Sequence, residues 1–245
     1  MAHHKLENGV LGAGFALFRD LGQDGDHSDV KGLPMTPPAS LPRAPAIAAG
    51  LALLFMTVAG PFGLLTTTAV TGAAEADALA QIVEGPRFRL AALAFILIAL
   101  ADIVAAWGLY LVLRPGADGL ALLAAWLRVA YAVMLAVATS HLVAAQPLAA
   151  AGDAAAVADV ARFSADWALS LGIFGAHLVV LGLAGWRSRI VPRLIAALVA
   201  IGGLAYFADA YGPLVWPGYA LGLAAYLFFG EILLMLWLFW AALRR

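Results

Sequence analysis

Long apolar runs dominate the chain from residue 46 onward, and the polar positions gather between them. Six runs are long enough to cross a hydrocarbon core of about 30 Å, which takes roughly 20 helical residues. They cover approximately 46–66, 90–113, 119–145, 166–186, 190–209 and 218–243. Their interiors are rich in Ala, Leu and Val, and the polar–apolar alternation of membrane β-strands is absent. The pattern therefore predicts an all-α polytopic membrane protein with a bundle of six transmembrane helices.

The first 45 residues have a different character. They are polar and rich in Gly and Pro, and their one apolar run, residues 10–18, is too short to span a membrane. We interpret residues 1–45 as a disordered cytoplasmic extension and residues 46–245 as the transmembrane domain. Met35 precedes Thr36-Pro37-Pro38 and resembles a second translation start. This suggests that the first 34 residues are an over-long gene prediction.

Charges in the loops predict the orientation. Every second loop is basic: Arg114 follows the second run, Arg187, Arg189 and Arg193 follow the fourth, and Arg244 and Arg245 end the chain. The opposite loops carry seven of the ten acidic residues that follow position 45. Because basic loops stay in the cytoplasm, both termini are expected there. In two opposite loops, 73–83 and 153–163, the apolar spacing suits a short interfacial helix; the alternative is a plain Ala-rich loop.

The composition indicates that the protein is surrounded by a lipid bilayer, and it excludes several kinds of function. The chain is 64% hydrophobic and 12% charged, whereas soluble domains are roughly 45–50% apolar and about 25% charged. A net charge of −1 offers no basic surface for nucleic acid. The absence of Cys excludes disulfides, iron–sulfur clusters and a thiol nucleophile. Neither a catalytic motif nor an acidic metal cluster is present, so we assign no catalytic residue and no metal ligand.

The most informative polar positions are ionisable residues inside the apolar runs. Asp102, Arg128, His177 and Glu231 lie in four different runs, and a rise of 1.5 Å per residue brings all four to within a few Å of one depth. A charge in that position costs on the order of a few kcal/mol unless it is paired or solvated. We therefore predict a polar centre at the middle of the bundle. It is either a structural latch or the head of a binding cavity.

Pairing is the economical arrangement of these groups. Arg128 keeps its charge and needs a carboxylate, and Asp102 is the expected partner because a tight turn joins their two helices. Glu231 and His177 would then share a proton or a hydrogen bond. The small neighbours Gly230 and Gly175 indicate either close approach of the fourth and sixth helices or a narrow cavity between them. The secondary candidates are His141, Asp209, Arg89 and Tyr131.

A bis-histidine haem would need two ligands at one level of the membrane. His141 lies about 10 Å from the depth of His177 along the bundle. We therefore predict no haem and no other cofactor.

The order and spacing of short motifs resemble a bacterial family known as domain of unknown function 4386. The motifs are Phe88-Arg89-Leu90, Ala101-Asp102-Ile103, Leu127-Arg128-Val129, Gly175-Ala176-His177-Leu178, Tyr206-Phe207-Ala208-Asp209 and Gly230-Glu231-Ile232. The resemblance covers about residues 46–245. It implies six helices in a bacterial cytoplasmic membrane and brings no activity with it.

Three functions remain open from the sequence. The first is a binding or accessory protein that holds a lipid-like or small amphipathic ligand, a partner subunit or a second copy of itself. The second is a proton-coupled transporter that uses Glu231 and His177, although no internal repeat supports it. The third and weakest is an intramembrane enzyme, because no nucleophile lies at the depth of His177.

Overall fold

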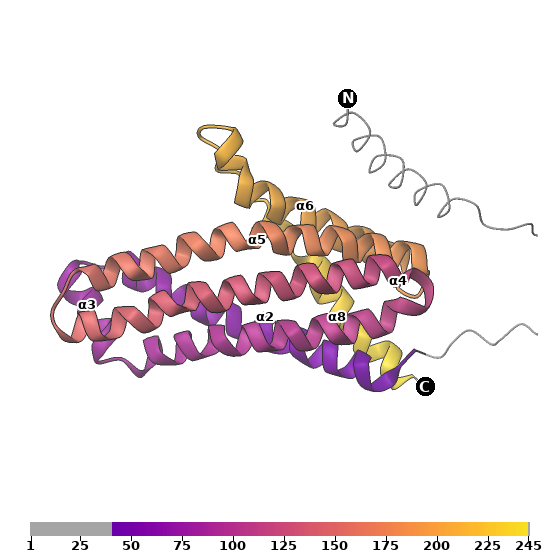
Figure 1. The fold of residues 1–245 in the computed structure, drawn as a ribbon, viewed down its shortest axis with the longest axis horizontal. Coiled ribbons are helices and arrows are strands. Elements are labelled where there is room, and N and C mark those ends of the chain that lie inside the picture. Colours follow the sequence, from indigo (N-terminus) through magenta and orange to yellow (C-terminus); the bar gives the residue numbers. More distant parts are fainter. Residues whose placement is uncertain (1–40, 245) are drawn as a thin grey trace, which may run out of the picture. The chain divides into compact units, whose positions relative to one another are not determined.

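The structure is a computed structural model that describes residues 41–244, so most of the predicted N-terminal extension lies outside it. The described chain contains helices and no strands. In order they are α2 (Arg43–Thr71), α3 (Glu75–Val83), α4 (Pro86–Ala150), α5 (Ala155–Ser188), α6 (Arg193–Val215), α7 (Ala224–Leu227) and α8 (Phe229–Leu243). Figure 1 shows the long helices running side by side, with α3 at one end.

The helices have the length and surface of membrane spans. Within residues 41–244, five helical stretches are long and apolar enough to cross a bilayer: α2, α4, α5, α6 and Ala224–Leu243. Large apolar side chains such as Leu51, Trp126 and Val137 are more than half exposed on the outside of the bundle. A surface of this kind is suited to lipid rather than water. The expectation of an all-helical, multi-pass membrane protein is confirmed at this level.

Helix α4 passes along the bundle twice. Its helical dihedral angles fail at Ala117, where φ is −160° and ψ is 49°. Arg128 donates a hydrogen bond to Asp102, 26 residues earlier, a separation that would be about 39 Å in a straight helix. The two arms are therefore folded back on each other, as Figure 1 shows. The sequence placed this turn at Arg114–Asp118, a range that contains Ala117.

The end of the bundle near α3 extends well beyond the predicted spans. Helix α5 has 34 residues and is about 51 Å long, whereas a hydrocarbon core is about 30 Å thick. The predicted helix at 73–83 is confirmed as α3, whose Ala78 and Ile82 are buried. The second candidate, 153–163, is also helical from Ala155 on, but it is the first part of α5 and not a separate element.

The last predicted span begins six residues too early. Residues 218–223 form a loop, because Gly218 and Gly222 adopt positive φ angles of 86° and 61°. The helix begins at Ala224 and is interrupted at Phe228, between α7 and α8. Hydropathy does not detect such a loop, since none of its six residues is charged. The fifth predicted span ends too early, since α6 continues past residue 209 to Val215.

Glycines do bring helices close together, but not the predicted pair. A Cβ atom added to Gly175 would lie 2.5 Å from the backbone nitrogen of Phe207, and one added to Gly230 would lie 2.6 Å from the carbonyl carbon of Leu198. Both neighbours belong to α6. The small residues therefore seat α5 and α8 against α6, which corrects the expectation that they pack against each other.

Candidate functional site

Arg128 is the centre of the buried polar cluster. Its side chain is 1% exposed and comes from the second arm of α4. Nε and Nη2 each lie 2.8 Å from Oδ1 of Asp102, on the first arm. Nη1 lies 3.0 Å from Nε2 of His177 on α5 and 3.7 Å from Oε1 of Glu231 on α8. One guanidinium thus joins both arms of α4 to two further helices.

The predicted contact between Asp102 and Arg128 is present, whereas the second pair is arranged differently. Among residues 41–244, no hydrogen bond joins Glu231 to His177; each is adjacent to the same nitrogen of Arg128. The sequence suggested two separate pairs. It missed that a guanidinium has enough N–H groups in a rigid fork to serve all three neighbours.

The hydrogen bonds of His177 fix its tautomer. Nδ1 lies 2.8 Å from the carbonyl oxygen of Ala124, so it must carry the proton and donate it. Nε2 then accepts from Nη1 of Arg128, a group that can only donate. His177 is therefore a neutral imidazole with both nitrogens engaged, and it serves to orient Arg128.

The carboxyl groups are less fully engaged than the guanidinium. Every nitrogen of Arg128 has a partner, including Nη2, which also lies 3.8 Å from Sδ of Met56. By contrast, Oδ2 of Asp102 is buried and has no hydrogen-bond donor among the described residues. Glu231 is 20% exposed, and its nearest charged partner is 3.7 Å away. The carboxyl groups of Asp102 and Glu231 can therefore still accept hydrogen bonds.

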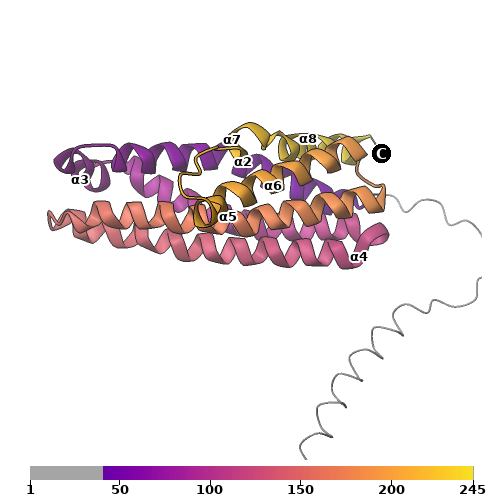
Figure 2. The same cartoon turned by 90° about the horizontal axis from the view of Figure 1, so that it is seen from above.

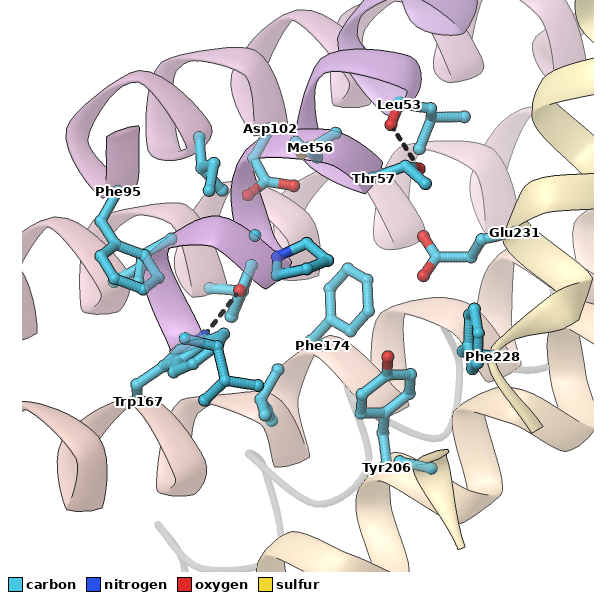
Figure 3. Close-up of a pocket in the computed structure, with 18 of the residues that line it drawn as sticks. Leu53, Met56, Thr57, Phe95, Asp102, Trp167, Phe174, Tyr206, Phe228 and Glu231 are labelled. Atoms are coloured by element: carbon cyan, nitrogen blue, oxygen red, sulfur yellow. Dashed lines mark hydrogen bonds between the residues drawn. The ribbon is translucent and has the colours of Figure 1, made fainter. Parts of the chain in front are cut away.

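A cavity of about 470 Å³ adjoins this cluster. Asp102, Arg128 and Glu231 contribute to its wall, and most of the remaining lining side chains are apolar or aromatic. Figure 3 shows the carboxyl groups of Asp102 and Glu231 and the hydroxyl of Tyr206 directed toward the space around Phe174. The cavity lies within the range of about 300–1,000 Å³ typical of small-molecule sites, and it combines an apolar wall with a few convergent polar groups.

Aromatic side chains form the wall next to Arg128. Phe174 packs against Tyr131 and Tyr206, with ring centroids 4.9 and 5.3 Å apart. The guanidinium carbon of Arg128 lies 5.3 Å from the Phe174 centroid, within the distance of a cation–π contact. Trp167 donates a hydrogen bond to the Tyr131 hydroxyl. The aromatic side chains of the wall thus pack against one another. The Tyr206 hydroxyl forms no hydrogen bond to any described residue.

The rim of the cavity lies between α2 and the α7–α8 segment. Thr57, Pro61 and Leu64 of α2 and Ala225 of α7 line the cavity and are exposed on the side of the bundle. Figure 2 shows α7 beside α2. Phe228, where the helix is interrupted, lies at this rim as well. No pattern in the sequence predicts this opening, because it depends on the loop that precedes Ala224.

Of the secondary candidates, only Tyr131 lines the cavity. His141 contacts Asp166 at 3.1 Å, near the end of the bundle that α3 covers. Asp209 accepts hydrogen bonds from the Tyr219 hydroxyl and from the backbone of Ala224, so it ties α6 to the loop before α7. Arg89 donates to the carbonyl of Val83 between α3 and α4. Their contacts are those of residues that fasten elements together.

Comparison with known proteins identifies the family of the chain but brings no activity. The chain is 30% identical over 143 residues to a protein of Archaeoglobus fulgidus described as an uncharacterized protein, an alignment that covers 58% of this chain and 77% of the relative. No solved structure matches the chain. The sequence profile of one family matches residues 48–241, which include all four residues of the buried polar cluster. The resemblance seen in the sequence is thereby confirmed, and the chain belongs to the family named domain of unknown function DUF4386.

Proposed function

We propose that this protein binds an amphipathic small molecule inside the membrane, with its polar head at the Arg128 cluster and its hydrocarbon part along the aromatic wall. The observation that carries the proposal is the cavity of about 470 Å³, whose polar groups gather at one place in an otherwise apolar lining. A purely structural latch would be packed on every side, since interiors hold few voids larger than a water molecule.

The proposal includes a six-span topology with both termini in the cytoplasm, counting each arm of α4 as one crossing. Two observations support it. The basic loops meet at one end, because a Cβ atom on Gly116 would lie 2.7 Å from Ser188, next to Arg187 and Arg189. The loop at Asp153 lies at the other end of α5. This segregation of charge follows the positive-inside rule, and the membrane is inferred to be a bacterial cytoplasmic membrane.

A cavity-filling substitution tests the binding function. Gly60 lines the cavity, and a Cβ atom there would meet nothing within 4 Å. Gly60→Phe should therefore be accommodated by the fold while its ring occupies the rim. Gly119→Phe is the matched control, because Gly119 is also helical with open space around its Cβ position but does not line the cavity.

The probes are photoreactive alkyl chains that carry a diazirine and end in an ammonium, hydroxyl or carboxylate group. In nanodiscs, at least one of them should label cavity residues such as Leu171 and Phe228. Gly60→Phe should lower that labelling several-fold, and Gly119→Phe should leave it unchanged. If every probe labels only lipid-facing residues such as Leu51, or if both variants label like the wild type, the cavity is not a binding site.

Proton-coupled transport is a second candidate, supported by the partial exposure of Glu231 and its lack of a close donor. His177 contributes little to it, because both ring nitrogens are engaged within the protein. Proton uptake by reconstituted vesicles that is lost in Glu231→Gln, with unchanged thermal stability, would support transport. Equal proton leak through wild type and variant would exclude it.

A further inference from the structure

We infer that the molecule bound in this cavity is a single-chain amphiphile with a primary ammonium head, held between Asp102 and Glu231. The inference rests on the proposed binding function and adds to it the charge, the hydrogen-bonding character and the size of the ligand. Three independent observations lead to it: the charge balance of the cluster, the use of its donors, and the volume and opening of the cavity.

The charge balance favours a cationic head. One guanidinium faces two carboxyl groups within 4 Å, and His177 is neutral. With both carboxyl groups ionised the cluster carries one net negative charge. A buried net charge is expensive in a membrane, and a positively charged ligand head would remove it, in competition with protonation of a carboxyl group.

The use of the donors disfavours an anionic head. Such a head would need free N–H groups, but the nitrogens of Arg128 already contact Asp102, His177 and Met56, and Glu231 lies 3.7 Å away. The donors left in the lining are the neutral hydroxyls of Tyr131 and Tyr206. By contrast, both carboxyl residues contribute to the cavity wall: Glu231 is partly exposed, and Oδ2 of Asp102, which neighbouring side chains cover, has no donor among residues 41–244. A head that donates several hydrogen bonds, as a primary ammonium does, matches these acceptors.

The volume and opening of the cavity define the rest of the molecule. A volume of about 470 Å³ lies within the range of about 300–1,000 Å³ for sites that take one small molecule, so it suits one alkyl chain and a small head. The exposed rim residues Pro61, Leu64 and Ala225 belong to the apolar side of the bundle. The ligand therefore enters from the bilayer. The same ammonium group also occurs on phosphatidylethanolamine, so the test must separate the two sources.

The experiment is a competition series with one chain length and different heads. Dodecylamine, dodecyltrimethylammonium, dodecanol and dodecanoate are added at pH 7 to the protein in nanodiscs labelled by the photoreactive alkylamine. Dodecylamine should compete about tenfold or more better than dodecanol, as expected for a charged hydrogen bond in a desolvated site. Dodecyltrimethylammonium, which has charge but no N–H donor, should fall between them, and dodecanoate should be weakest.

A variant that removes one charge tests whether Glu231 is responsible for the preference for an ammonium head. Glu231→Gln should reduce the advantage of dodecylamine over dodecanol several-fold. The control is Glu84→Gln, an exposed residue between α3 and α4, which should behave like the wild type. Glu231 is partly exposed and accepts no close hydrogen bond, so its substitution should preserve the fold, which a thermal unfolding curve verifies.

The results distinguish an error in the ammonium assignment from an error in the proposed binding function. Equal competition by all heads, a preference for dodecanoate, or an amine preference that survives in Glu231→Gln would overturn the ammonium assignment while binding in the cavity stands. Competition by phosphatidylethanolamine but not by dodecylamine would overturn the single-chain assignment. No competition by any amphiphile, together with no labelling of cavity residues, would overturn the binding function itself.

Discussion

At the residue scale, Arg128 organises the polar centre because its charge cannot be removed by losing a proton. It is 1% exposed and contacts side chains from both arms of α4, from α5 and from α8. Each neighbour has a different role. Asp102 neutralises the charge, His177 orients the guanidinium, and Glu231 stays available on the cavity side.

The first prediction concerns the coupling of Asp102 and Arg128. Arg128→Ala leaves a buried carboxylate without its counter-charge and should lower the free energy of unfolding by about 3–5 kcal/mol. Removing both residues should cost clearly less than the sum of the single changes. Thermal or chemical unfolding in detergent measures the cycle. The control pair is Asp159 and Arg162, whose arginine is 62% exposed, so its coupling should be below about 1 kcal/mol.

The second prediction concerns His177. Because Nδ1 donates to Ala124 and Nε2 accepts from Arg128, the ring should be the neutral tautomer with its proton on Nδ1. Nitrogen chemical shifts of histidine-labelled protein distinguish the tautomers directly. A proton on Nε2, or an imidazolium, would contradict the assignment of His177 as an acceptor for Arg128.

At the element scale, helix α6 is clamped between α5 and α8 by close backbone contacts. Gly175 and Gly203 face each other across α5 and α6, and a Cβ atom on either would lie 2.6 Å from the carbonyl oxygen of the other. Contacts this close require glycine, and they allow helices to associate without a hydrophobic driving force. The same clamp sets the position of Tyr206 in the cavity wall.

The third prediction tests that clamp. Gly175→Ala places a methyl group against backbone atoms of α6 that cannot move aside, so it should destabilise the fold by about 1–3 kcal/mol. Gly119→Ala is the matched control, since its Cβ position is open and alanine is favoured over glycine in a helix by about 1 kcal/mol. Comparable loss of thermal stability in both variants would show that the α5–α6 contact is looser than described.

The sequence predicted well those features that depend on residues close to one another in the chain. It predicted less well those features that depend on how distant helices pack. The depth match of Asp102 and Arg128 identified their contact, because a short turn makes their helices neighbours. The shared use of Arg128 by His177 and Glu231 was missed, because it depends on where α5 and α8 lie around α4. The start of the last helix was misplaced, because positive φ angles at Gly218 and Gly222 leave no trace in hydropathy.

At the scale of the whole molecule, the bundle separates charge between its two ends and opens sideways in between. The turn of α4 and the end of α5 bring basic residues together. The opposite end carries Asp153, Asp159 and Asp166 around the prolonged α4 and α5. The cavity opens between α2 and α7, on the apolar side of the bundle rather than at either charged end.

The fourth prediction is the orientation of this molecule in the membrane. Because the chain has no native Cys, single cysteines at Gly152 and Arg189 can be labelled individually in intact cells. The two positions lie just beyond opposite ends of α5. A membrane-impermeant maleimide should label position 152 from outside and position 189 only after permeabilisation. Labelling of position 189 in intact cells would reverse the topology.

The central claim is that a polar centre built on Arg128 forms the head of a ligand cavity within the membrane. An experimental structure determined in lipid, with dodecylamine present, tests it most directly. We predict one elongated density. Its polar end should lie within hydrogen-bond distance of Asp102 and Glu231, and its chain should run toward Pro61. A cavity closed by direct contact of its lining side chains, or density confined to the outer surface of the bundle, would contradict it.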